Sequence, residues 1–368
     1  MRRPIALCVL LSFVVSLAGV VWAGEDIEDI IVRREAARRF ATLPDGARFP
    51  EGIAANPETG DIFVGTFDFG PNSNKLLRFR KSGRLAAQRD FGNTPLLGLA
   101  FNPLDGKVYI ANVGALVGGM SKIQRIAANF TGTTPIEDVA VIPGKPDVGA
   151  PPDRTEGNPD GSTDTITFGN NAPAPNALVF TSGGDLFISD SFQGAIFKIV
   201  GAHTCTTPCS VETVKHDGLL ATAGFPPFGA NGLALSSDEE TLFIANTGDD
   251  RILKMDLPSG PVEIFAESIN GADGIAFGKD GRLWVAANQA DGVVALNGVG
   301  RVVAKLGDFL GIRSDGSARG LLFPASLVIV DDEIFVTNLA LPLNGVGGDE
   351  PEEDVSTYTV SRIHIPRH

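Results

Sequence analysis

Four residues with oxygen-bearing side chains stand in equivalent places along this sequence, each directly ahead of a short apolar run. They are Glu51, Asn176, Asn231 and Asp273. Carboxylate and amide oxygens are the donors that Ca²⁺ and similar hard cations bind. A polar side chain in a crowded interior is costly unless it is paired or bound to a metal. Together the four residues predict a divalent-cation site, with Ca²⁺ as the expected ion.

These residues could have roles other than binding a hard cation. Asn and Asp ahead of a strand also make hydrogen bonds to turns, and this structural role remains the alternative for each residue taken alone. No His stands at any of the four positions, which disfavours a zinc-type imidazole site. The four His of the chain lie outside the repeated pattern described next, which argues against a serine–histidine hydrolase.

A unit of two short strands recurs along the chain and positions the candidate ligands. Each copy has an apolar strand, a turn that usually contains Gly or Asp, and a second strand with an aromatic centre. The first strands are predicted at residues 51–55, 98–101, 176–180, 231–235, 273–277 and 326–329. Their first residues are Glu51, Gly98, Asn176, Asn231, Asp273 and Ser326. The candidate ligands therefore hold the same position in four of the six units.

Further strands extend most units. Residues 75–79 and 122–126 alternate apolar with polar side chains, which predicts a third strand with one buried face. A weaker fourth strand is indicated at 262–265. Four antiparallel strands in each of six units predict an all-β, six-bladed propeller. In such a ring the first strands line a central channel, so their starts converge at one mouth.

The repeat also predicts how the ring closes. The last unit has no outer strand left after residues 357–365, whereas residues 38–43 resemble the outer strand of the fifth unit. We therefore expect residues near 38–43 to complete the last blade, which removes an exposed sheet edge. A single propeller domain then spans residues 24–368.

Two polar segments interrupt the repeat. Residues 143–173 are rich in Pro, Gly, Asp, Asn and Thr, and a structureless connection of this length is uncommon. Because this segment leads into the start of a first strand, two interpretations are open: a lid over the central site, or a disordered insertion on the surface. Residues 341–354 form a second extra loop, which is acidic and expected in solvent.

The N-terminus has the layout of a secretory signal. Arg2 and Arg3 precede an apolar run over 5–21, and small residues stand at the −3 and −1 positions ahead of Gly24. Removal of residues 1–23 would place the mature protein in the periplasm or outside the cell; an uncleaved membrane anchor is the alternative. Export permits disulfides, and a local bond between Cys205 and Cys209 is expected.

The charge balance limits the partners. The chain has 44 acidic and 30 basic residues, a formal net charge of −14. Nucleic-acid binding needs clustered Lys and Arg, so no nucleic-acid partner is expected. The acidic balance also argues against adsorption to anionic lipid, and no membrane association is predicted after signal cleavage. A small-molecule substrate is expected, and the sequence indicates no particular protein partner.

The motifs around the candidate ligands resemble those of a known family. The motifs are Pro50-Glu51-Gly52, Pro175-Asn176, Asn231-Gly232 and Asp273-Gly274, each on a different unit. In these the chain resembles the senescence-marker-protein/gluconolactonase (regucalcin-like) family of six-bladed propellers. The resemblance implies a metal-dependent hydrolase of a small lactone or ester. It also implies a divalent metal held by Glu51, Asn231 and Asp273, with Asn176 as a further ligand or substrate contact.

The resemblance also implies catalytic roles and leaves alternatives. Asp273 and Asn176 are the implied catalytic residues, with Asp273 as general base, or as nucleophile in a phosphotriesterase-like variant. Family members often carry an Asp where this chain reads Phe63-Val64-Gly65-Thr66, and no Arg or His stands beside the ligands to select a sugar lactone. A non-catalytic binding propeller of the NHL type with a structural ion remains the alternative. The four candidate ligands together disfavour a strictosidine-synthase-like enzyme.

Overall fold

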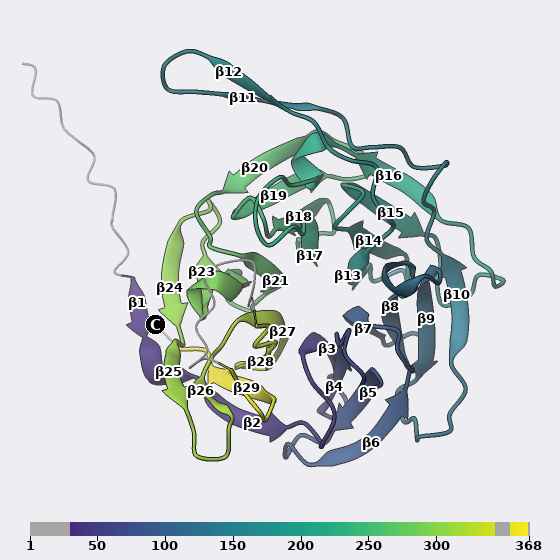
Figure 1. Ribbon diagram of the computed structural model, residues 1–368, viewed down its shortest axis with the longest axis vertical. Coiled ribbons are helices and arrows are strands. Elements are labelled where there is room, and N and C mark those ends of the chain that lie inside the picture. The colour runs from purple at the N-terminus through teal and green to yellow at the C-terminus, as the bar shows by residue number, and fades with distance from the viewer. Residues whose placement is uncertain (1–29, 343–353, 367–368) are drawn as a thin grey trace, which may run out of the picture.

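Six antiparallel sheets surround a central axis in the computed structural model, which describes residues 30–342 and 354–366 (Figure 1). In four of the sheets the strands lie in chain order from the axis to the rim, and in the other two an N-terminal strand forms the outermost edge. Helix is nearly absent from the described residues, where the helical elements are short 3₁₀ turns at Arg34–Ala36, Gly114–Val117, Gly218–Leu220 and Asn288–Ala290. The predicted all-β, six-bladed propeller is confirmed.

The first three blades follow the chain from the axis outward. Blade one consists of β3 (Pro50–Asn56), β4 (Asp61–Thr66), β5 (Lys75–Phe79) and β6 (Leu85–Asp90). Blade two consists of β7 (Leu96–Asn102), β8 (Lys107–Val113), β9 (Ser121–Ala127) and β10 (Glu137–Val141). Blade three consists of β13 (Pro175–Phe180), β14 (Leu186–Asp190), β15 (Ala195–Ile199) and β16 (Glu212–His216).

The other three blades continue around the ring. Blade four consists of β17 (Ala230–Leu235), β18 (Thr241–Asn246), β19 (Arg251–Asp256) and β20 (Val262–Ala266). Blade five consists of β21 (Ala272–Phe277), β22 (Leu283–Ala287), β23 (Gly292–Leu296) and β24 (Val302–Leu306). Blade six consists of β27 (Pro324–Val330), β28 (Glu333–Asn338), β29 (Thr359–His364) and β2 (Arg38–Thr42), and a small pair, β25 (Phe309–Ile312) and β26 (Ala318–Gly320), precedes it.

The N-terminal segment closes the ring as predicted. Strand β2 pairs antiparallel with β29 and forms the outer edge of blade six. The Thr337 hydroxyl donates to the Glu51 carbonyl at 2.7 Å, which joins blade six to blade one near the axis. The sequence did not predict β1 (Ile31–Arg33), which pairs parallel with β24 as a fifth strand of blade five.

Apolar side chains fill the junctions between neighbouring blades. Six buried clusters are present among the described residues, and each joins strands of adjacent blades. The aromatic centres of the second strands contribute to them; Phe63, Tyr109 and Trp284 are all fully buried. The hydrophobic core of this protein is therefore a circle of inter-blade contacts rather than one central mass, which leaves the axis free for polar groups.

Glycines let the innermost strands approach one another. A Cβ on Gly52 would lie 2.1 Å from the Leu97 carbonyl oxygen, and one on Gly232 would lie 2.2 Å from that of Asp273. Each of these glycines directly follows a candidate ligand. The Glu-Gly and Asn-Gly pairs therefore have a steric reason: only a residue without a side chain permits this spacing of the strands.

The segment 143–173 does not cover the axis. It contains a two-stranded hairpin, β11 (Arg154–Gly157) and β12 (Thr163–Ile166), which Figure 1 shows beyond the outer strands of blades three and four. Arg154 pairs with Asp249 of blade four at 2.5 Å, and Glu156 pairs with Arg251 at 3.1 Å. The segment is therefore a surface insertion, but the predicted disorder is wrong, because a paired hairpin and ion pairs hold it to the rim.

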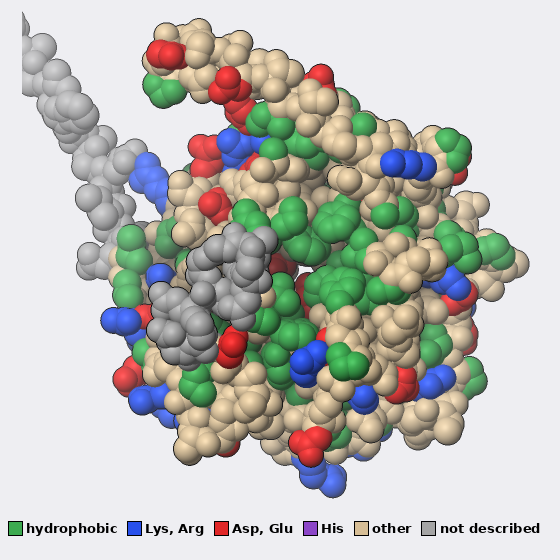
Figure 2. Space-filling view, viewed as in Figure 1, with side chains coloured by type: hydrophobic (Ala, Val, Ile, Leu, Met, Phe, Trp, Pro, Cys, Tyr) green, Lys and Arg blue, Asp and Glu red, His purple; other side chains and the backbone are tan. Residues whose placement is uncertain are grey.

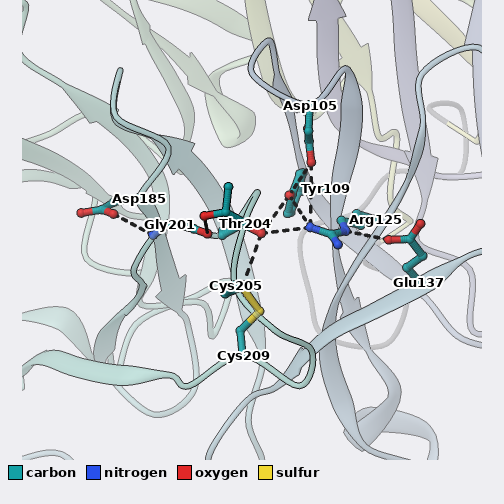
Figure 3. Close-up of a disulfide and its surroundings, with 10 residues drawn as sticks. Asp105, Tyr109, Arg125, Glu137, Asp185, Gly201, Thr204, Cys205 and Cys209 are labelled. Atoms are coloured by element: carbon teal, nitrogen blue, oxygen red, sulfur yellow. Dashed lines mark hydrogen bonds and ion pairs between the residues drawn. A yellow bond between two sulfur atoms is a disulfide. The ribbon is translucent and has the colours of Figure 1, made fainter.

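The expected disulfide is present between Cys205 and Cys209 (Figure 3). It lies in the loop between β15 and β16 of blade three. This loop is fastened to blade two, because the Cys209 amide donates to the Val139 carbonyl at 2.8 Å and Arg125 donates to the Ala202 carbonyl at 3.0 Å. The disulfide therefore closes a short loop whose contacts join two blades.

Two predicted segments lie wholly or mostly outside the described residues. They are the secretory signal at 1–23 and most of the acidic loop at 341–354. In the part of the chain that the structure describes, no helix has the length and apolar character needed to span a membrane.

Candidate metal centre

The four predicted residues come together at one mouth of the axial channel. Glu51, Asn176, Asn231 and Asp273 come from β3, β13, β17 and β21, and all four line one pocket. Their exposed fractions are only 2–4 %. Asn176 and Asn231 also line a second pocket deeper in the channel, so they stand between the two pockets. The side chains thus meet at a narrow point of the channel, where buried polar groups need partners.

The prediction that Gly98 and Ser326 stand in the same register as the four ligands is wrong. In the strand pairing, Leu96 and Pro324 occupy the places that Pro50 occupies in blade one, so the equivalents of Glu51 are Leu97 and Ala325. Gly98 and Ser326 instead lie one residue further along and line the deeper channel. The reason is that Gly98 is equivalent to Gly52, the residue after the ligand position, and not to Glu51.

Hydroxyl groups that directly follow the second strands orient the two amides. The Asn176 amide Nδ2 donates to Ser191 at 2.9 Å, and the Asn231 Nδ2 donates to Thr247 at 2.9 Å. Each hydroxyl in turn donates to a backbone carbonyl of the next blade, at 2.8 and 2.7 Å. Because both Nδ2 atoms are engaged in this way, the amide oxygens remain available as acceptors or ligands.

Asn288 is a pocket residue that the sequence reasoning missed. It follows β22 directly, the place that Ser191 and Thr247 take after their own second strands. Its Nδ2 donates to Asp273 Oδ2 at 3.1 Å. The signal that could have found it is a polar residue just after the second strand in three consecutive units, which is weaker than the pattern on the first strands.

Three oxygens in this pocket lack a hydrogen-bond partner. They are Glu51 Oε2, Asp273 Oδ1 and Asn288 Oδ1, and all are buried. Most buried polar atoms of proteins are hydrogen-bonded, so three such acceptors in one pocket require an explanation. An oxygen-preferring cation satisfies acceptors without requiring donors. The residues present therefore fit a divalent cation.

The electrostatics of the two carboxyl groups agree with this fit. Burial, together with the nearby charge of Asp273, raises the pKa of Glu51 well above its ordinary value. Burial also raises the pKa of Asp273 to about 8, although hydrogen bonds from Asn288 and Asn231 act to lower it. A cation between the two groups would reverse these shifts. Among the described residues no group of three or more His, Cys, Asp or Glu could hold a metal, so a cation bound here would also need amide oxygens.

Hydrophobic side chains form the walls around these polar groups. Figure 2 shows them around a hollow at the centre of one face of the ring. The pocket is narrow at the ligands and opens to solvent, with about 370 Å³ of empty space when its open mouth is counted. Its apolar lining comprises Phe67, Leu97, Pro226, Phe228, Phe323, Leu339 and Leu341.

A protein-family model matches the part of the chain that contains blades four and five, which supply Asn231, Asp273 and Asn288. The family model described as SMP-30/gluconolactonase/LRE-like region matches residues 209–307. The predicted resemblance is confirmed. No curated protein is similar enough in sequence to match this chain.

Solved structures share the whole fold. A luciferin-regenerating enzyme superposes with a TM-score of 0.60 at 12 % identity, covering 86 % of this chain and 92 % of its own. A regucalcin from Agrobacterium tumefaciens, described as a calcium-binding protein, gives 0.59 at 16 %, covering 91 % and 95 %. A gluconolactonase from Xanthomonas campestris gives 0.52 at 14 %, covering 89 % and 91 %. At these identities the similarity establishes the fold alone.

Proposed function

We propose that this protein is an exported, metal-dependent hydrolase of a small lactone or ester. Glu51, Asn231 and Asp273 would hold the metal, most simply Ca²⁺, with Asn176 and Asn288 beside them. The observation that carries the proposal is the set of three buried, unpartnered oxygens facing one pocket. The family match over blades four and five supports the hydrolase class, and the calcium-binding neighbour supports the choice of ion.

Asp273 has the geometry of a general base. Its Oδ2 accepts from Asn288, which orients the carboxylate and leaves Oδ1, the atom that a bound cation would also contact, in the pocket as the proton acceptor. A bound divalent cation would supply polarisation of the substrate carbonyl and a lower pKa for water. Asp273 then takes a proton from water as the water oxygen attacks the carbonyl carbon. The bond from that carbon to the ring or ester oxygen breaks, and the proton passes to the departing oxygen.

Asn176 supplies orientation rather than charge. Ser191 holds its amide nitrogen, so the amide oxygen keeps one direction relative to the pocket. This oxygen serves as a further metal ligand or as the acceptor for a substrate hydroxyl or water. Because both partners are buried, the arrangement needs no reorganisation when substrate enters.

The proposal is tested by metal analysis of the purified protein together with hydrolysis assays. The panel comprises lactones, aryl esters and phosphotriesters, each with and without chelator. We expect stoichiometric divalent metal, chelator-sensitive hydrolysis, and a loss of at least about 10²-fold in kcat/KM for Asp273→Asn. Asp61→Asn is a matched control, because Asp61 is equally buried but lies at the far end of its blade from Glu51.

The possible outcomes separate the alternatives. Bound metal without hydrolysis of any substrate would favour the non-catalytic NHL-type propeller with a structural ion. Hydrolysis that survives both chelator and Asp273→Asn would contradict the proposed mechanism. Export is tested separately: the mature protein recovered outside the cytoplasm should begin at Gly24.

A further inference from the structure

The walls of the pocket point to the chemical class of substrate. Building on the function proposed above, we propose that the site takes a lactone or ester whose side group is hydrophobic, and that it discriminates against polyhydroxylated sugar lactones. The metal-binding end of the pocket would hold the carbonyl, and the apolar walls would hold an alkyl or aryl substituent.

The polar groups of the pocket are those of the proposed metal site and their hydrogen-bond partners. Besides the four predicted residues, the polar side chains among the described lining are Asn288 and Thr247. The Thr247 hydroxyl accepts from Asn231 and donates to the Ala272 carbonyl, and the Asn288 amide nitrogen donates to Asp273. No Lys, Arg or His occurs in this described lining. A sugar lactone would place several hydroxyls against the apolar walls, where the described lining residues offer them no partners, which is strongly unfavourable.

The apolar wall continues outward from the pocket as linked aromatic rings. Phe67 and Phe228 line the pocket, with ring centroids 6.4 Å apart. Phe69 packs edge-on against Phe67 at 4.8 Å, and Phe192 packs against Phe228 at 5.2 Å. Phe69 is 54 % exposed. The rings therefore form a continuous surface, supplied by blades one, three and four, that leads from solvent to the metal ligands.

The backbone at Phe323 supports a role for its side chain. Phe323 lines the pocket and has φ +43°, a left-handed conformation that bulky residues rarely adopt. The equivalent residue two places before Asp273 is Gly271, with φ +62°. Glycine adopts this conformation without strain. Phe49 is the other equivalent with positive φ, and its ring packs inside the protein on Tyr358 at 4.9 Å, whereas that of Phe323 faces the pocket.

The experiment measures kcat/KM of the Ca²⁺-loaded protein on a series of δ-lactones. The series runs from the unsubstituted six-membered ring through alkyl substituents of two, four and six carbons, with glucono-1,5-lactone as the sugar member. Each buried methylene should raise kcat/KM roughly fourfold until the pocket is full. The sugar lactone should be at least about tenfold poorer than the best alkyl lactone.

Two variants test whether the apolar wall of the pocket causes the preference for alkyl lactones. Phe323→Gly and Phe228→Ala should lower kcat/KM for the longest alkyl lactone more than for the unsubstituted ring, which flattens the series. Phe323→Gly should also keep its melting temperature better than Phe228→Ala, because glycine removes the backbone strain. Phe277→Ala is the control: its half-buried ring packs on Phe243 at the opposite end of β21, so the chain-length dependence should be unchanged.

The outcomes distinguish this inference from the proposed function. A flat series in the unaltered protein, or a sugar lactone processed as well as the best alkyl lactone, overturns the inference while the hydrolase proposal stands. If no lactone is hydrolysed, the hydrolase proposal fails for lactones. Calorimetry with the matching alkyl lactams, which resist hydrolysis, then measures the pocket directly. Affinity that rises with the length of the alkyl chain supports the apolar site. Affinity that does not depend on chain length overturns the inference.

Discussion

At the scale of single residues, the candidate site combines acidic groups with fixed amides. Glu51 and Asp273 bring the charge, while Asn176 and Asn231 are oriented by hydroxyls of their own blades. These four could be predicted because each precedes an apolar strand in a repeated unit. Asn288 could not, because a polar residue after a strand is common and only the pairing with Asp273 gives it significance.

The first prediction concerns pH. Asp273 has an ordinary pKa of 3.8 that burial raises to about 8, so without metal the folded protein binds this proton more tightly than the unfolded chain. The free energy of unfolding should therefore fall as pH rises from about 4 to about 8. Urea denaturation in chelator at pH 5, 6.5 and 8 measures this.

The same measurement has internal controls. Saturating Ca²⁺ should restore stability at pH 8, because metal binding requires the deprotonated ligands. Asp273→Asn removes the titrating group and should reduce the slope. A metal-free protein that is equally stable at pH 5 and pH 8 would contradict the assigned environment of Asp273.

A second prediction tests Asn288. Truncation to Ala removes the donor to Asp273 and one unpartnered oxygen of the pocket. Loss of such a supporting contact typically weakens metal binding by about 10- to 100-fold. Titration calorimetry with Ca²⁺ checks this, with Asn297→Ala, a turn residue between β23 and β24, as the matched Asn control. Unchanged affinity would reduce Asn288 to a structural role.

At the scale of elements, the spacing of the innermost strands decides whether the ligands can meet. The Gly after Glu51, Asn231 and Asp273 lets each first strand lie against the next blade's backbone. Sequence repetition predicted these strands well, but it misplaced the register in blades two and six. The reason is physical: Gly marks the point of close approach, one residue beyond the ligand, and blade six carries Ser326 there instead.

The third prediction follows from that contact. Gly232→Ala places a Cβ 2.2 Å from the Asp273 carbonyl, so the two strands must separate. Overpacking of this kind costs about 1–3 kcal/mol in the free energy of unfolding. Ca²⁺ affinity should fall as well, because Asn231 and Asp273 move apart. Gly149→Ala, whose added Cβ contacts nothing, is the control for both readouts.

At the scale of the whole molecule, closure by β2 gives the ring its continuity. The repeat count and the leftover outer strand at 38–43 made this closure predictable. Strand β1 was not predictable, because three residues in a parallel pairing leave no pattern of alternation. The position of the 143–173 hairpin was likewise hidden, since it depends on the pairing of Arg154 with Asp249, 95 residues away.

The fourth prediction compares two truncations of the mature chain. Removing residues up to 33 deletes only β1 and should lower the melting temperature slightly. Removing residues up to 42 also deletes β2, which exposes the edge of β29. It also removes Phe40, whose ring centroid lies 4.7 Å from that of Phe335. We expect a much larger loss of melting temperature and association through the free edge in size-exclusion chromatography. Similar behaviour of both truncations would show that closure contributes little.

The pairing of β2 with β29 also sets an order of events during biosynthesis. The first of these strands is made near the beginning of the chain and its partner near the end, more than 300 residues later. Until β29 is made, β2 has no strand to pair with, so blade six cannot be completed. Completion of this blade is therefore a late event in synthesis. A chain interrupted before β29 would keep unpaired edges on both β2 and β28, and such edges favour aggregation.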